Sequence, residues 1–287
     1  MMKKIIIILL SIVSVAYSQD STKSVYPIDR GGVGYKINNT ELKGRAIDST
    51  RIFKMGSDTV LRVTDKWYAR FAGIYGNGGD MTSKINLFNS RSYVGKMTFE
   101  YDTITNVTVN GTVNFVKPVE IGRNASFTGT GTINFNGNIL DADPDKVIFG
   151  PNITVTGLRT RNGLIPARWF GAVADGATDN YSFFTKAQSA ASSGMTVQIA
   201  RGDHRINSTF TQTVNFLGDP GSTVKYNTAS VATGLYMWTL SAPGISLKNL
   251  TLDGSDKCMT IVRIGAFPDI HLIGDTLMEW NQVGGIS

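Results

Sequence analysis

A short motif recurs near the carboxy-terminal end of the sequence at a constant spacing. Pro243–Leu247 (PGISL) returns as Pro268–Leu272 (PDIHL), and Leu252 returns at the same offset as Leu277. In both copies apolar residues alternate with polar ones, which is typical of a β-strand with one buried face. Because one strand-rich coil cannot bury that face alone, the repeat predicts a solenoid in which each coil packs on its neighbours.

A second, looser repeat predicts two modules in tandem. Lys66–Asp80 (KWYARFAGIYGNGGD) is similar to Arg168–Asp179 (RWFGAVADGATD), and apolar residues at helical spacing follow each segment. We therefore expect short helices near residues 80–92 and 179–193. The matched residues are Trp67 with Trp169, Gly73 with Gly171, Asp80 with Asp179, and Val113–Phe115 with Val214–Phe216.

The composition favours an all-β chain and excludes several classes of function. Gly, Asn, Thr, Val and Ile are abundant, as in strands joined by many turns. The formal net charge of +6 is compatible with an acidic partner, but no basic-aromatic stripe indicates nucleic-acid binding. Cys258 is the single cysteine, which excludes an intrachain disulfide, and two histidines without a Cys-x-x-Cys pair give no zinc site.

The first residues have the features of a secretory signal peptide. Lys3 and Lys4 form its charged region, Ile5–Val15 its apolar region, and Ala16–Ser18 a cleavage site. The apolar region is too short for a membrane anchor, and no later stretch is apolar enough to span a membrane. We expect residues 1–18 to be removed and the protein to be secreted or held at the cell surface.

The next segment, residues 19–65, carries little pattern. It is interpreted as a leader or attachment segment. Within it, residues 51–63 favour a hairpin about the turn Gly56–Asp58.

Trp169–Asp179 (WFGAVADGATD) resembles the opening signature of the pectate-lyase-like right-handed parallel β-helices, which include pectin-lyase-like and rhamnogalacturonase-epimerase-like proteins. Bacteriophage tail spikes share this signature. The resemblance implies an all-β, right-handed parallel β-helix with short capping helices and polysaccharide as its ligand. It divides the chain into a degenerate module, residues 66–165, and the amino-terminal coils of a β-helix, residues 166–287, which end like a truncated solenoid.

Residues of the signature are expected to be structural. Asp179 suits the cap of the following helix, and Asp175–Gly176 suits a tight turn. Gly202 keeps the glycine of the family's P-x-G-x-Y pattern, in which Ala200 and His204 replace the proline and the tyrosine. The structural set is Trp169, Gly171, Asp175, Gly176, Asp179 and Gly202.

Three carboxylates are the weak candidates for catalysis. Asp253 and Asp256 follow one predicted strand, and Glu279 ends the equivalent strand one coil later. Stacked coils bring such side chains together, as a glycoside hydrolase requires, whereas lyases of this fold use carboxylates to hold Ca²⁺. The Asp-Asp, Gly-His-Gly and Arg-x-Pro-x-x-Arg strings of those enzymes are absent, so solvated turn residues are the simpler alternative.

Asp203, His204 and Arg205 form a second polar group. Alternation along a strand places Asp203 and Arg205 on one side and His204 on the other. The group is either an acid-base cluster or, more simply, a surface ion pair between Asp203 and Arg205.

Aromatic side chains on the surface are the expected means of gripping a sugar. The candidates are Tyr226, Tyr236, Trp238 and Trp280. Tyr236 and Trp238 share one face of a predicted strand, so Trp238 serves either the core or a ligand.

Two functions remain open. The first is the amino-terminal part of a polysaccharide lyase or glycoside hydrolase acting on an acidic polysaccharide. The second is a non-enzymatic β-helix, either a polysaccharide-binding adhesin or a receptor-binding protein similar to a phage tail spike, for which the resemblance implies a homotrimer. Ca²⁺ is implied only for a lyase.

Overall fold

The structure is a computed structural model that describes residues 66–90, 95–227, 236–258 and 260–278, together with four short strands closer to the amino terminus. The chain divides into two units, Met1–Asp65 and Lys66–Ser287. In the first unit β1 pairs with β2 and β3 pairs with β4, both in antiparallel register. Their bounds are Tyr26–Pro27 (β1), Tyr35–Lys36 (β2), Ile52–Met55 (β3) and Asp58–Arg62 (β4).

Strands β3 and β4 form the hairpin expected over residues 51–63, with Met55 opposite Asp58. Its turn residues Gly56 and Ser57 lie outside the described residues, as does the predicted signal peptide, residues 1–18. Among the described residues, no helix is long and apolar enough to cross a membrane.

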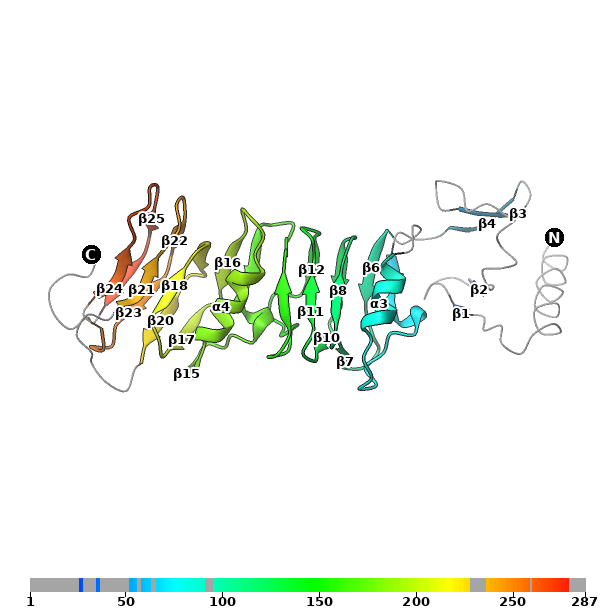
Figure 1. Ribbon diagram of the computed structural model, residues 1–287, viewed down its shortest axis with the longest axis horizontal. Helices are drawn as coiled ribbons and strands as arrows, with labels where there is room; N and C mark the ends of the chain where they lie inside the picture. Colours follow the sequence, from blue (N-terminus) through cyan, green and yellow to red (C-terminus); the bar gives the residue numbers. More distant parts are fainter. Residues whose placement is uncertain are drawn as a thin grey trace. The chain divides into compact units, whose positions relative to one another are not determined.

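The second unit is a parallel β-solenoid of about 8 turns, and Figure 1 shows its strands side by side from β6 to β25. Strands at the same position in successive coils pair in parallel, which gives three sheets in each of two successive parts of the solenoid. The expected all-β parallel β-helix with two short helices is therefore confirmed. We call the coils from β5 to β13 module 1 and those from β14 to β26 module 2.

The sheets of each module are named by their order within a coil. In module 1 they are the first sheet, β5 (Lys66–Tyr68), β6 (Lys96–Phe99), β9 (Val119–Ile121) and β12 (Leu140–Ala142); the second, β7 (Thr105–Thr108) and β10 (Ala125–Thr128); and the third, β8 (Thr112–Asn114), β11 (Thr132–Asn134) and β13 (Thr154–Thr156).

Module 2 repeats this arrangement with more strands in its first and second sheets. They are the first sheet, β14 (Leu164–Pro166), β16 (Thr196–Ile199), β19 (Asn215–Gly218), β22 (Ser246–Lys248) and β25 (His271–Ile273); the second, β15 (Asp175–Asp179), β17 (Gly202–Ile206), β20 (Ser222–Tyr226), β23 (Thr251–Asp253) and β26 (Thr276–Met278); and the third, β18 (Phe210–Gln212), β21 (Tyr236–Leu240) and β24 (Thr260–Ile264).

The constant-spacing repeat of the sequence is the stacking register of the last two coils. Leu247 pairs with Leu272 and Leu252 pairs with Leu277 on neighbouring strands. Like residues thus stack on like residues, which lets one apolar row serve every coil.

Two α-helices, α3 (Thr82–Asn89) and α4 (Tyr181–Ala190), stand where the third strand of a coil would be. A helix leaves the edge of the neighbouring strand unpaired, which is costly for buried backbone groups. Side chains of the helix supply the missing partners. Asn86 of α3 accepts a hydrogen bond from the Asn114 amide (3.2 Å) and donates to the Thr112 carbonyl (2.7 Å). Gln188 of α4 does the same for Thr213 (3.2 Å) and Thr211 (3.0 Å), beside β18.

Each helical coil also contains a 3-10 turn, η1 (Ala69–Ala72) or η2 (Ala167–Phe170), that ends at a glycine with positive φ. Gly73 has φ 71° and Gly171 has φ 107°, so the match of these two glycines is confirmed. The turns align Phe71, and not Trp67, with Trp169, which corrects that match. The Val-Asn-Phe triplets also differ in position, because Val113–Phe115 enters the third sheet and Val214–Phe216 the first. A triplet with apolar residues on either side of a polar one suits a strand of any of the three sheets, so the Val-Asn-Phe match did not identify equivalent strands.

A continuous core links the modules. Phe149 of module 1 packs on Phe170 of η2, with ring centroids 5.2 Å apart. Helix α4 follows, and its Ala190 carbonyl accepts a hydrogen bond from Leu158 (2.8 Å). Burial of a large apolar side chain contributes about 1.5–3 kcal/mol, so this core is the main source of stability. Cys258 lies in it, and burial raises the pKa of its thiol to about 11.

Candidate functional site

The second sheet of module 2 displays two rows of polar side chains, which we call the charged face. Alternation along each strand turns every second residue outward, and parallel register aligns these residues from coil to coil. One row is Asp179, Arg205, Lys225, Asp253 and Met278; the other is Asp175, Asp203, Thr223, Thr251 and Thr276. Three successive strands, β15, β17 and β20, therefore carry accessible charge on one surface, whereas Asp253 at the next step is buried and Met278 is apolar.

Asp175, at the first coil of the charged face, is committed to its own turn. One oxygen accepts the amides of Ala177 (2.9 Å) and Thr178 (2.8 Å), and the other accepts the Thr178 hydroxyl (2.7 Å). The Thr178 hydroxyl and these amides lower the pKa of Asp175 to about 2. Gly176 has φ 66°, which a turn of this kind requires. Asp175 is thus an ionised structural residue.

Asp179 caps α4 from one residue farther back than expected. The residue at the N-cap is Asn180, while the Asp179 carboxylate accepts the Tyr181 amide (3.1 Å) and the Asn207 amide of the next coil (3.2 Å). Asp80 of module 1 does the same with Thr82 (3.0 Å) and Asn110 (3.1 Å). The match of Asp80 with Asp179 is therefore confirmed.

Asn180 is a structural residue that the sequence reasoning missed. It is fully buried, accepts the Val173 amide (2.8 Å), and donates to the carbonyls of Val173 (2.9 Å) and Thr178 (3.0 Å). One side chain thus holds both ends of the signature loop. An Asn directly before a helix was the available signal.

The remaining signature residues are structural as well. Trp169 is buried, and its indole nitrogen donates to the Asp143 carbonyl at 2.8 Å. A Cβ on Gly202 would lie 2.9 Å from the Cβ of Ala174, and one on Gly171 would lie 3.0 Å from the Phe183 ring. Both glycines permit close packing between adjoining segments.

The group at residues 203–205 alternates as expected but pairs differently. Asp203 forms its ion pair with Lys225 of the next coil (2.8 Å) and not with Arg205. His204 points into the core, where its Nε2 lies 2.9 Å from the Ala200 carbonyl oxygen and its Nδ1 has no hydrogen-bond partner. Burial lowers the pKa of His204. The three residues therefore do not form one acid-base cluster.

The candidate catalytic carboxylates are not assembled into a pair. Asp253 is buried and accepts the amide (2.8 Å) and hydroxyl (3.3 Å) of Ser255. Asp256 is exposed in the same turn, with φ 54°. Glu279 lies outside the described residues. Within the described ranges no group of three or more His, Cys, Asp or Glu side chains could hold a metal ion.

Asp275 is another carboxylate with a perturbed pKa. Burial raises the pKa of its side chain, as general acids require. Both of its oxygens, however, accept backbone amides, from Leu250 (2.9 Å) and from Ile273 (3.1 Å). Asp275 therefore joins the last two coils.

The structure places the candidate aromatic residues mostly in the core. Trp238 is fully buried and donates to the Gln212 side-chain oxygen (2.7 Å), and Tyr226 is also buried. Tyr236 is partly exposed, with the guanidinium of Arg263 4.8 Å from its ring centroid. Trp280 lies outside the described residues. Of the three described candidates, Tyr236 is the one whose side chain is accessible to a sugar.

The corresponding surface of module 1 carries neutral residues at the positions of Arg205, Lys225 and Asp203. Thr108 pairs with Asp80 and so occupies the position of Arg205, and Thr128 occupies that of Lys225. Asn106 stands at the position of Asp203. Its side chain is neutral, and its oxygen accepts a hydrogen bond from the Ser126 hydroxyl (2.5 Å). The charged face is thus specific to module 2.

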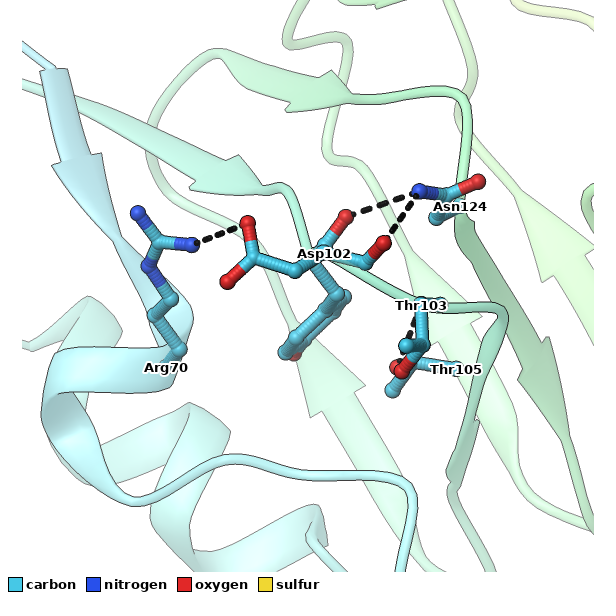
Figure 2. Close-up of polar contacts among 6 residues, drawn as sticks. Arg70, Asp102, Thr103, Thr105 and Asn124 are labelled. Atoms are coloured by element: carbon cyan, nitrogen blue, oxygen red, sulfur yellow. Dashed lines mark hydrogen bonds and ion pairs between the residues drawn. The ribbon is translucent and has the colours of Figure 1, made fainter. Parts of the chain in front are cut away.

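The ion pairs of module 1 lie at a turn and on its first sheet. Figure 2 shows Arg70 beside Asp102 (3.5 Å), while Asn124 of the next coil donates to the carbonyls of Tyr101 (2.9 Å) and Asp102 (3.3 Å). Thr105 donates to the Thr103 carbonyl within the same turn (3.0 Å). These contacts stabilise the connection between the first and second sheets.

A cluster on the first sheet of module 1 also escaped the sequence reasoning. Lys96 lies 2.6 Å from a Glu120 oxygen and 3.8 Å from an Asp141 oxygen. Glu120 and Asp141 pair in register on adjacent strands. Their spacing in the sequence is one coil, a signal that becomes readable only once the coil length is known.

Comparisons with protein-family models, with curated proteins and with solved structures found no significant match to this chain.

Proposed function

We propose that this chain is an exported, carbohydrate-active β-helix protein that binds an acidic polysaccharide along the charged face of module 2. The observation that carries the proposal is the in-register repetition of polar side chains, two per coil, on that face. Adjacent strands lie about 4.8 Å apart, so an extended polymer meets similar groups at regular steps.

Charge and hydrogen-bonding chemistry support this ligand. Arg205 and Lys225 offer the charge-assisted hydrogen bonds that carboxylates and sulfates accept, and Thr223, Thr251 and Thr276 offer hydroxyl groups beside them. Removal of Lys3 and Lys4 with the signal peptide changes the formal net charge from +6 to +4, a mild excess that is compatible with a polyanion. The resemblance of Trp169–Asp179 to the pectate-lyase-like family points to the same class of ligand.

Binding is favoured over cleavage because the carboxylates of the charged face are engaged. Asp175, Asp179 and Asp253 accept backbone amides, and Asp203 is paired with Lys225. A glycoside hydrolase needs one carboxyl group to give a proton and a second to act as base or nucleophile.

Cleavage is the second candidate, and it rests on a different surface. Glu120 and Asp141 stand in register on neighbouring strands of module 1, and a hydrolase requires two carboxylates that face one glycosidic bond. Lys96 contacts both of them.

One experiment separates these functions. The mature protein, recovered from the medium after export with its own signal peptide, is titrated with polygalacturonate, dextran sulfate and neutral dextran, and new reducing ends are measured in the same samples. We expect binding to the polyanions without new reducing ends. Production of reducing ends that is lost in Glu120→Gln or Asp141→Asn would replace binding by hydrolysis, and absence of binding to every polymer would overturn the proposal.

A further inference from the structure

Arg205 is held in a fixed position by neutral partners. Its Nε donates to the side-chain oxygen of Asn207 at 2.9 Å. The side-chain amide of Asn227, one coil later, lies against the guanidinium; when its oxygen is assigned to that side, as hydrogen bonding requires, the oxygen is 2.8 Å from Nε, 2.9 Å from one terminal nitrogen and 3.2 Å from the other. An arginine restrained in this way has already lost much of its side-chain freedom, so less entropy is lost when it binds.

Neither amide lies along the outer edge of the guanidinium. An oxygen at nearly equal distances from all three nitrogens lies over the plane of the group, whereas the N–H bonds point outward within that plane. The terminal nitrogens of Arg205 donate to no other described residue. They form the planar fork that binds a carboxylate or sulfate through two parallel hydrogen bonds.

Arg205 also lacks an ion-pair partner within the described part of the chain, since Asp179, its register neighbour on the preceding strand, accepts the backbone amides of Tyr181 and Asn207. Arg205 forms no ion pair with any described residue, although Lys225, its neighbour in register, is paired with Asp203. The eight residues that follow Asn227 and lie outside the described ranges contain no Asp or Glu. Two cations placed opposite each other on adjacent strands are destabilising, and a bound anion offsets that cost.

Module 1 shows that the scaffold does not need this arginine. Thr108 occupies the same position, preceding an asparagine that makes the same backbone contact with the helix-capping aspartate. In module 1 that asparagine, Asn110, accepts the Thr130 amide instead (3.2 Å). Arg205 is therefore an addition to the fold rather than a part of its construction.

We infer that Arg205, oriented by Asn207 and Asn227, is an anion-binding subsite that recognises one carboxylate or sulfate group of a saccharide chain. The inference rests on the proposed function, because it names the residue that selects the acidic polymer. Asn207 and Asn227 are positioning residues, and Lys225 adds charge beside the subsite.

The test compares variants by their affinity for polygalacturonate and for dextran sulfate, which distinguishes the two sources of the anion. Arg205→Thr installs the residue of module 1 and is expected to weaken binding to the preferred polymer at least tenfold. Arg205→Lys keeps the charge but loses the planar fork, and Asn207→Ala loses the restraint on the arginine. The affinities of both variants should therefore lie between those of the wild type and of Arg205→Thr. The matched control is Arg161→Thr, which makes the same change in net charge at an exposed turn.

Three outcomes decide the inference. Loss of affinity in Arg205→Thr but not in Arg161→Thr supports it. Equal affinity of Arg205→Thr and the wild type would overturn it while leaving the proposed function standing. If the wild type binds neither polymer, the proposed function fails, and the subsite is then judged by titrating free galacturonate and inorganic sulfate while the Nε–H resonance of Arg205 is followed. A shift of this resonance that chloride does not reproduce would support the subsite, and the absence of any shift would overturn it.

Discussion

Modules 1 and 2 build the same coil from different side chains. In each, a 3-10 turn ends at a left-handed glycine, an aspartate ties a short helix to the next coil, and amides of the helix pair with the neighbouring strand. The outward positions of the second sheet differ. Module 1 presents Thr108, Thr128 and Asn106 where module 2 presents Arg205, Lys225 and Asp203. The shared features are those that backbone hydrogen bonding requires, and the differing ones are available for function.

The modules also differ in their buried side chains. Exchanging one such residue for its counterpart tests how much the difference contributes to the free energy of unfolding. Phe184 of α4 contacts Phe210, Phe216 and Trp238, with centroid distances of 6.0, 6.4 and 6.5 Å. We expect Phe184→Ala to lower the free energy of unfolding by about 3–5 kcal/mol because it leaves a cavity. Phe184→Ile, which installs the buried residue of α3 at the same place, Ile85, should cost less. Urea unfolding at constant m-value measures both. Equal losses in the two variants would show that the ring contacts contribute little.

The next effect concerns the residue at the start of each helix. Asn180→Met installs Met81 of module 1 and leaves the Val173 amide and carbonyl without their partner. We expect a loss of about 2–4 kcal/mol, since buried polar groups without partners are costly. Thermal unfolding provides the measurement, and Ser182→Ala, at an exposed position of α4, is the comparison. A change in midpoint no larger than that of Ser182→Ala would contradict this role for Asn180.

The buried histidine should make module 2 sensitive to acid. Burial lowers the folded-state pKa of His204 below its unfolded value of about 6.5. The unfolded chain then binds the proton more readily, so the stability is fully present above that pH and falls as the pH decreases below it. His204→Val installs the buried Val107 of module 1. Its stability, measured by urea unfolding between neutral and mildly acidic pH, should fall less steeply than that of the wild type. Parallel curves would assign the acid sensitivity to other groups.

The smallest effect is expected at the surface ion pair. Asp203 and Lys225 are about half exposed, so Asp203→Asn, which installs Asn106 of module 1, should change stability by less than about 1 kcal/mol. The change should shrink further in high salt. A larger loss that salt does not reduce would mean that Asp203 supports the fold.

The sequence determined the periodic features of this protein. Alternating apolar residues and a constant repeat were enough for a parallel solenoid, since the pattern of Leu247, Leu252 and their copies is the stacking register itself. Glycines at turns and aspartates before helices were recognisable for the same reason, because their roles depend on local backbone geometry.

Only the tertiary structure decided which residues meet across coils. Coils differ in length, so the residues that face each other on adjacent coils cannot be read from a fixed spacing. Asp203 pairs with Lys225 of the next coil and not with its neighbour Arg205, and Arg205 is contacted by Asn207 of its own coil and Asn227 of the next. The burial of Trp238 was undecided in the sequence, because a ring between apolar neighbours suits a core and a binding surface equally well. Local conformation is encoded in a few adjacent residues, whereas a site on a solenoid is made by register, and register depends on the length of every loop between its strands.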